Sequence, residues 1–407
     1  MITRALVFTC ATAAMLSLAV LGSSRSSAGP TSGNIRPLRI LQPMGPHGQL
    51  GRAGFEVGKV LHTADGGQVF GFDVDQNGND GLLASAQTIS PQGQVLASVE
   101  TFDQTTAKIA KVVVTTRTMD DFVTYGIVGD DVGLVLHEHV VNNRNIRTFR
   151  ILAPVTSNMF TGKWTPPNGS NFLLQRVASN QSTAKSAIFA TDLSGNPFVF
   201  SSMIASNTFG PVFDLDPGHF GGADQPQMAQ DIAHNRAVFA TSPDAGAVGG
   251  QEPLIATVNL SNGNMREFNG VIIPPFHSGF VNGLAVDSST GIACTTTELD
   301  ADVEFYDLAR ETGFFVQLPG ANGGQSFSGE AVASDPIHHL FLVAQPNGSI
   351  GPPGDSVVDI FDENGNVVES ITGIKAFGIT PGLAINPAKR VGFIDGPTAD
   401  AITRFTY

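Results

Sequence analysis

Tryptophan, cysteine and charge of either sign are scarce in this 407-residue chain, which contains 1 Trp, 2 Cys and 14% charged residues. Long solvated helices usually carry many Glu and Lys, so the low charge argues against a mainly helical protein. Basic residues are the scarcer kind, with 22 Lys and Arg against 36 Asp and Glu. Such an acidic surface repels phosphate backbones and anionic lipids, which excludes nucleic acid and membrane surfaces as expected partners. It is compatible with cations or neutral sugars.

Long apolar runs are also absent after the N-terminus, which has the pattern of a secretory signal peptide. The segment MITR gives a positive start, ALVFTCATAAMLSLAVLG an apolar run, and Ser26–Ala28 the small residues that signal peptidase reads. We predict cleavage after Ala28, so that 1–28 is a signal peptide and 29–54 an N-terminal extension. An uncleaved membrane anchor is the alternative. The mature protein is expected to be secreted, extracellular or periplasmic.

Cleavage removes Cys10 and leaves Cys294 as the remaining cysteine, so no disulfide framework is expected despite export. Cys294 lies in the apolar segment IACTTT, where a buried small hydrophobic residue is more common than a nucleophile. Stability must therefore come from burying a large core.

One phrase recurs at nearly even intervals. It reads QPQMAQDIAHNR from Gln225, VNGLAVDSSTG from Val281, SGEAVASDPIHH from Ser328 and TPGLAINPAKR from Thr380. Aligning the phrases makes four apolar residues equivalent: Met228, Leu284, Val332 and Leu383.

A second recurring feature is a tight turn between two short strands with alternating apolar residues, which is typical of β-hairpins. The turns are marked by Gly93, Asn143–Asn145, Gly195, Gly263, Gly313 and Gly365. We predict that these hairpins are equivalent to one another, with a repeat of about fifty residues.

This period, with four short strands in each unit, is typical of a β-propeller. We predict an all-β fold in which residues 55–407 form a single propeller of seven four-stranded blades, with six and eight as the limits. The last unit lacks a strand, so Ile402–Thr406 should pair with an N-terminal strand from Ile35–Leu41 or Phe55–Leu61. A two-sheet sandwich is the alternative, but it does not explain the period.

The phrase NGLAVDSSTG and the hairpins of the form D-x-x-x-G-x-V-V resemble blades of the YVTN/NHL-like and SMP-30/gluconolactonase-like propeller superfamily. The resemblance covers Gln225–Tyr407 and extends to residues 60–200 by spacing alone. WD40 repeats are disfavoured, because the chain has one Trp and no Gly-His…Trp-Asp rhythm. In SMP-30-like enzymes, Glu, Asn and Asp side chains from inner strands hold a catalytic divalent ion.

The resemblance implies that Asn282 and Glu330, which head two inner strands, are candidate metal ligands. Oxygen ligands of this kind suit Ca²⁺, which is the possible cofactor. The sequence departs from the pattern at Pro226 and Pro381, where further ligands would be expected. Additional candidate ligand-binding residues lie in nearby loops: His219, Asp224 and His277. Polar residues lining a water-filled channel are the alternative interpretation.

Three long Gly- and Pro-rich segments are predicted to share one face of the propeller: Ala205–Pro226, Ser242–Pro253 and Gln345–Ser356. Long loops on a rigid scaffold commonly carry function, although they could also be neutral insertions.

Other polar motifs have structural interpretations. Asp73–Gly81 resembles a calcium loop but lacks the ligand at its end, so we predict a hairpin turn on the opposite face. His137 and His139 share one face of a strand. Asp287 and Asp335 are predicted to bond their own turns, and His338 and His339 to be solvated.

Two functions remain open, and whether the protein is an enzyme stays undecided. The first is a non-catalytic extracellular propeller that binds a small molecule, a glycan or a protein through its long-loop face. The second is a Ca²⁺-dependent lactonase or esterase of the SMP-30 type. We expect a monomer.

Overall fold

The computed structural model describes the part of the chain that carries the repeats. The described residues are 57–88, 95–118, 121–128, 132–141, 144–153, 159, 161–164, 172–181, 185–192, 194–203, 208–215, 220, 226–241, 254–269, 281–297, 302–318, 331–345, 354–376 and 382–407.

These residues form seven four-stranded antiparallel sheets. The three N-terminal sheets, each from inner to outer strand, are β2 (Gln68–Val74), β3 (Asp80–Thr88), β4 (Val95–Asp103) and β5 (Lys108–Thr118); β6 (Asp121–Val128), β7 (Val132–Val141), β8 (Arg144–Leu152) and β9 (Gly162–Trp164); and β10 (Phe172–Asn180), β11 (Lys185–Asp192), β12 (Pro197–Met203) and β13 (Thr208–Asp214).

The four C-terminal sheets, in the same order, are β14 (Gln227–Asp231), β15 (Arg236–Thr241), β16 (Leu254–Asn259) and β17 (Met265–Asn269); β18 (Val281–Asp287), β19 (Ile292–Thr297), β20 (Asp302–Asp307) and β21 (Thr312–Gln317); β22 (Ala331–Asp335), β23 (Leu340–Gln345), β24 (Gly354–Asp362) and β25 (Val367–Ala376); and β26 (Leu383–Asn386), β27 (Val391–Asp395), β28 (Ala401–Thr406) and β1 (Val57–His62).

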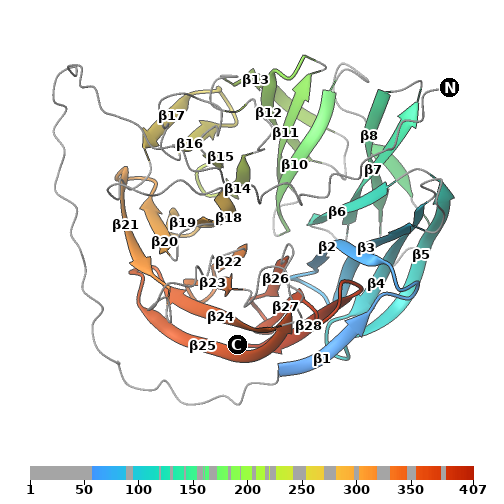
Figure 1. Ribbon diagram of the computed structural model, residues 1–407. Coiled ribbons are helices and arrows are strands. Elements are labelled where there is room, and N and C mark those ends of the chain that lie inside the picture. Colours follow the sequence, from blue (N-terminus) through green and yellow to red (C-terminus); the bar gives the residue numbers. More distant parts are fainter. Residues whose placement is uncertain are drawn as a thin grey trace, which may run out of the picture.

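The inner strands surround a common centre (Figure 1). Contacts run from β2 through β6, β10, β14, β18 and β22 to β26, and β26 in turn contacts β2. This arrangement is a single all-β propeller with four-stranded blades, as the sequence predicted. Within the described residues, no helix is long and apolar enough to cross a membrane.

The predicted pairing of the two chain ends is confirmed. β1 pairs antiparallel with β28, so that Leu61 lies opposite Ile402 and Val60 opposite Thr403. The strand comes from the second of the two proposed segments, Phe55–Leu61. Ile35–Leu41 lies outside the described residues.

The predicted register of the inner strands is also confirmed. Met228, Leu284, Val332 and Leu383 each lie three residues before the polar residue that ends an inner strand. These polar residues are fully buried: Asp231, Asp287, Asp335 and Asn386.

The predicted equivalence of the hairpins is wrong in the N-terminal half. The turns at Gly93, Asn143–Asn145 and Gly195 join the second and third strands of their sheets, whereas those at Gly263 and Gly365 join the third and fourth. Gly313 lies just inside β21, next to a turn of the second kind. Both kinds of hairpin require a residue comfortable at positive φ, such as 87° at Gly195 and 73° at Gly263, so local sequence does not distinguish them.

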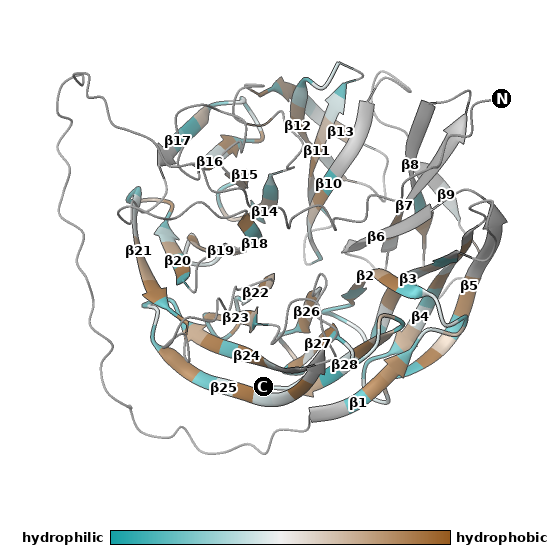
Figure 2. Cartoon of the chain, in the orientation of Figure 1, coloured by the Kyte–Doolittle hydropathy of each residue, from teal (hydrophilic) through white to brown (hydrophobic). Residues whose placement is uncertain are grey.

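The core lies between neighbouring sheets, where aromatic rings interlock. Phe305 of β20 packs against Phe341 and Phe361 of the next sheet, with ring centroids 5.7 and 6.0 Å apart. Phe102 and Phe393 make the corresponding contact between the first and last sheets at 4.9 Å. Outer strands such as β25 and β1 carry both apolar and polar residues (Figure 2).

Candidate functional site

Antiparallel strand order defines two faces of the propeller. Inner strands begin at one face, which we call the loop face, and end at the other, which we call the turn face. The segments 242–253 and 346–353 each join a second strand to a third, so both leave from and return to the loop face. The third predicted loop, Ala205–Pro226, is wrong in part, because it contains β13. Its remainder after β13 joins two sheets at the loop face.

Asn282 is the one proposed site residue within the described part of the chain. It lies near the loop-face end of β18, at a β-bulge between Val281 and Gly283, and is partly buried. A Cβ atom on Gly283 would lie 2.8 Å from the backbone nitrogen of Val332, so the neighbouring inner strand approaches very closely here. Four proposed residues lie outside the described part: Glu330, His219, Asp224 and His277. The calcium site of Asn282 and Glu330 therefore stays a prediction.

The turn face has a clearly defined repeated geometry. Asp287 accepts a hydrogen bond from the backbone N–H of Ser289 (2.8 Å), and Asp335 accepts one from Ile337 (3.0 Å), as predicted for residues that bond their own turns. The fourth residue after each buried polar residue has a positive φ. These residues are Asn235 (50°), Gly291 (76°), His339 (56°) and Arg390 (51°).

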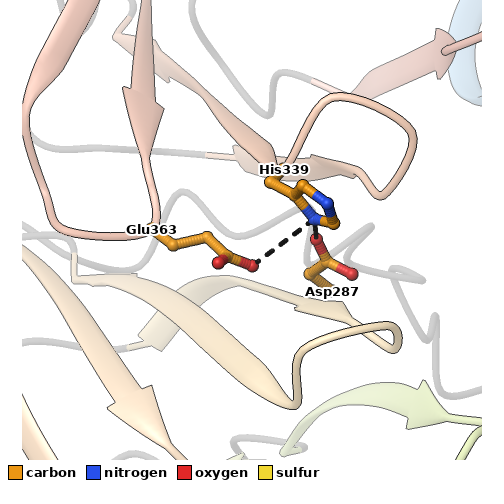
Figure 3. Close-up of side chains that lie close together, drawn as sticks. All are labelled: Asp287, His339 and Glu363. Carbon is orange, nitrogen blue, oxygen red and sulfur yellow. Dashed lines mark hydrogen bonds and ion pairs between the residues drawn. The ribbon is translucent and has the colours of Figure 1, made fainter.

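The sheet β22–β25 directs two of its side chains at Asp287 of the preceding sheet (Figure 3). His339, in the turn between β22 and β23, places its Nδ1 2.9 Å from Asp287 Oδ2. Glu363, directly after β24, places its Oε1 3.8 Å from the same nitrogen. The three ligand atoms all lie within 4.8 Å of one another. One imidazole nitrogen and two carboxylate oxygens thus converge between two sheets.

Two hydroxyl groups fix the carboxylates of this cluster. Ser289 Oγ donates to Asp287 Oδ1 over 2.6 Å, and Thr290 Oγ1 donates to Glu363. Ser289 Oγ also lies 3.3 Å from His339 Nδ1. In a Ser-His-Asp triad the serine and the acid contact different ring nitrogens. Here both contact Nδ1, so the arrangement is not that of a nucleophilic triad.

The pKa values of His339 and Glu363 are both shifted by neighbouring groups in the cluster. The hydrogen bond with Asp287 raises the pKa of His339 above its usual value, because the bond stabilises the imidazolium form. Burial raises the pKa of Glu363, and the neighbouring Asp287 carboxylate raises it further. Asp287 is fully buried, whereas the Glu363 and His339 side chains are 22% and 51% exposed.

His338 and His339 are exposed, as predicted, but each also contacts a buried carboxylate. His338 Nδ1 lies 2.8 Å from Asp335 Oδ2, and His339 bonds Asp287. A comparison of the repeated phrases could have predicted that His339 has a special role. His339 occupies the position of Gly291 in the aligned phrase, and a histidine with positive φ is uncommon.

The Asp73–Gly81 segment and Cys294 follow their structural interpretations. The Asp73–Gly81 segment is a hairpin on the turn face, where Gln104 Nε2 donates to Asp75 O and Asp80 O (2.7 Å each). Asn386 of the last sheet also donates to Asp75 O (2.8 Å), so this turn connects the first sheet to the last. Cys294 is buried, and burial raises the pKa of its thiol, as expected for a residue that is not a nucleophile. His137 and His139 lie on β7, two positions apart.

No protein-family model matches the sequence, and no curated protein matches it. Solved structures do share the fold. Raptor from Chaetomium thermophilum matches with a TM-score of 0.54 and 9% identity over 85% of this chain, which spans 28% of that chain. U3-55K has a TM-score of 0.56 with 10% identity, covering 87% of this chain and 99% of its own.

The WD40 repeats of RRP9 have a TM-score of 0.55 with 10% identity, covering 87% of this chain and 97% of their own. Identities this low show the fold alone. The chain is thus a β-propeller whose neighbours include WD40 propellers. Membership of the YVTN/NHL-like or SMP-30-like superfamily stays a prediction.

Proposed function

We propose that the chain is a secreted, non-catalytic β-propeller that binds an extracellular small molecule, glycan or protein through its loop face. We count each of the seven sheets as one blade of a closed ring. The observation that carries the proposal is the unequal length of the connections. In the four C-terminal sheets, connections at the loop face such as 242–253, 270–280 and 318–330 are long, whereas first-to-second-strand turns at the opposite face such as 232–235 and 288–291 are short. In the three N-terminal sheets, loop-face connections such as 119–120 and 142–143 are short.

A rigid ring with long connections on one face is a common way to present a binding surface. The strands that flank these connections are rigidly placed, because second strands such as β19 and β23 are buried on both sides. The acidic composition favours neutral or cationic ligands over phosphate-rich ones. The predicted signal peptide supports an extracellular or periplasmic location.

A Ca²⁺-dependent lactonase or esterase is the second candidate. It is favoured by the position of Asn282, which lies at the loop-face end of an inner strand. In that mechanism Asn282 and Glu330 would hold Ca²⁺, and the ion would polarise a substrate carbonyl. A working site would need further oxygen ligands and a general base.

Two measurements distinguish these functions. We would replace 242–253 with an Asn-Gly turn and compare the binding of both proteins to an array of neutral glycans. The binding function predicts that the shortened protein keeps its melting temperature but loses glycan retention, whereas the turn-face variant His338→Ala retains both. If no neutral glycan is retained by the unaltered protein, the glycan form of the proposal is rejected.

The second measurement uses δ-gluconolactone and p-nitrophenyl acetate as probes, with and without Ca²⁺. The binding function predicts no turnover above background and no change in melting temperature when Ca²⁺ is added to the EDTA-treated protein. Ca²⁺-dependent turnover that Glu330→Gln abolishes would establish the hydrolase instead.

A further inference from the structure

The cluster of Asp287, His339 and Glu363 is made of groups that the propeller scaffold does not require. Equivalent places occur between other neighbouring sheets, each with a buried polar residue that ends an inner strand. Two positions of the following sheet face it, namely the positive-φ residue of the first turn and the residue directly after the third strand.

These positions hold different residues at the three junctions in which all are described. Asp231 is followed by Gly291 and Leu308, Asp287 by His339 and Glu363, and Asp335 by Arg390 and Tyr407. Gly291 adopts positive φ without steric cost and Leu308 is buried in the core, so both are ordinary scaffold residues. The turn and the core therefore do not require a histidine or a glutamate at the positions of His339 and Glu363.

Each neighbouring junction holds one carboxylate side chain, whereas this one holds two. Arg236 Nε lies 2.7 Å from Asp231 Oδ2. Asp335 accepts from the Tyr407 hydroxyl (3.2 Å), and the Arg390 guanidinium lies 5.4 Å from the Tyr407 ring centroid. In the described part of the chain, no Lys or Arg forms an ion pair with Asp287 or Glu363. Two carboxylates share a single imidazole.

We propose that Asp287, His339 and Glu363 form a binding site for a divalent transition-metal ion of the zinc class. An imidazole nitrogen with two carboxylate oxygens is a donor set that Zn²⁺ uses, whereas Ca²⁺ takes oxygen ligands. The 2.9 and 3.8 Å separations between His339 Nδ1 and the two oxygens are in the range for ligands that share one ion at ~2.1 Å. A 2+ charge offsets the two carboxylates.

The surroundings of the cluster fit this role. Ser289 and Thr290 donate to the carboxylates and hold them in place, which is the usual task of groups surrounding metal ligands. The half-exposed imidazole gives the ion a path from solvent and leaves room for water as a further ligand. The ion would connect two neighbouring sheets at the turn face. This site is separate from the calcium site predicted at the loop face.

Zinc titration of the full, untagged protein tests the proposal. After treatment with EDTA and removal of the chelator, calorimetry should show one Zn²⁺ bound per chain. Two variants, His339→Gly and Glu363→Leu, introduce the residues of the neighbouring junction, so the turns should still form. We expect each to weaken Zn²⁺ binding by at least roughly tenfold.

His338→Ala is the matched control, because it removes the adjacent surface imidazole and should leave Zn²⁺ affinity unchanged. Co²⁺ provides a spectroscopic check, since its visible absorption should appear in the unaltered protein and be lost in His339→Gly. Glu330→Gln should not alter zinc binding, which separates this site from the loop face. Equal Zn²⁺ affinity in all variants, or an equal loss in His338→Ala, would overturn the proposal. If His339→Gly does not fold, Glu363→Leu alone decides.

Discussion

Asp359 should make the protein less stable as the pH rises through the weakly acidic range. This aspartate lies in the middle of β24 and is fully buried. Gln345 Nε2 and Ser370 Oγ donate to its two oxygens. Burial nevertheless raises its pKa to about 6, although these two hydrogen bonds oppose the shift.

The sign of the effect follows from proton uptake. An unfolded aspartate releases its proton near pH 3.8, whereas the folded protein keeps it until about pH 6. Between these values the folded state binds more protons than the unfolded state, so the free energy of unfolding falls as the pH rises. The difference between the two pKa values corresponds to about 3 kcal/mol at pH 7.

Asp359→Asn removes this titration and isolates its effect. We expect the free energy of unfolding of the variant, relative to the unaltered protein, to increase by about 2.4 kcal/mol between pH 4 and pH 7. Urea unfolding followed by circular dichroism at both pH values measures it. Any packing or hydrogen-bonding defect of the asparagine is present at both pH values and cancels. Glu369→Gln, on the neighbouring strand β25, controls for the loss of one carboxylate.

A stability difference between Asp359→Asn and the unaltered protein that is the same at pH 4 and pH 7 would refute the reasoning. It would mean that the folded carboxyl group titrates as it does in the unfolded chain.

Three further predictions concern other residues. Gly283→Ala should destabilise the protein by roughly 1–3 kcal/mol in urea unfolding, because the added Cβ meets the backbone of β22. Gly291→Asn should be tolerated, since Asn235 at the equivalent position also has a positive φ, and equal stability of the two variants would contradict this reasoning. Cys294 should react with a thiol reagent at the rate of unfolding, and fast labelling of the native protein would show that it is not buried. N-terminal sequencing of the exported protein should begin at Gly29, and a mature chain starting at Met1 would disprove the predicted leader.

The repeat was readable from sequence because each phrase ends in a polar residue with a fixed structural task. Asp287 and Asp335 each accept a hydrogen bond from their own turn. This shared task marks the end of each phrase, so Met228, Leu284, Val332 and Leu383 could be aligned correctly. The type of hairpin was not readable, because Gly195 and Gly263 satisfy the same backbone requirement in different turns. β13 was missed for a related reason, since TFGPVFD contains a Gly and a Pro, which are uncommon within strands.

The candidate site was harder to predict than the fold. Its three residues are distant in sequence, and they meet because one sheet packs on the next. Glu363 follows Asp362 in an ordinary hairpin, so nothing local distinguishes it from a solvated acid. The informative signal was a comparison across repeats, in which an acid replaces Leu308 and a histidine replaces Gly291.

The pairing of β1 with β28 has a consequence for how the chain acquires its structure. The strand at Val57–His62 is made long before its partner at Ala401–Thr406. Until β28 has been made, β1 has no partner in the last sheet, and the ring cannot close. Pairing over so long a separation is slow, because the entropy of closing the loop opposes it. For the secreted protein that we propose, this delay would be useful, since a chain that cannot close early remains open enough to be threaded through a translocation pore.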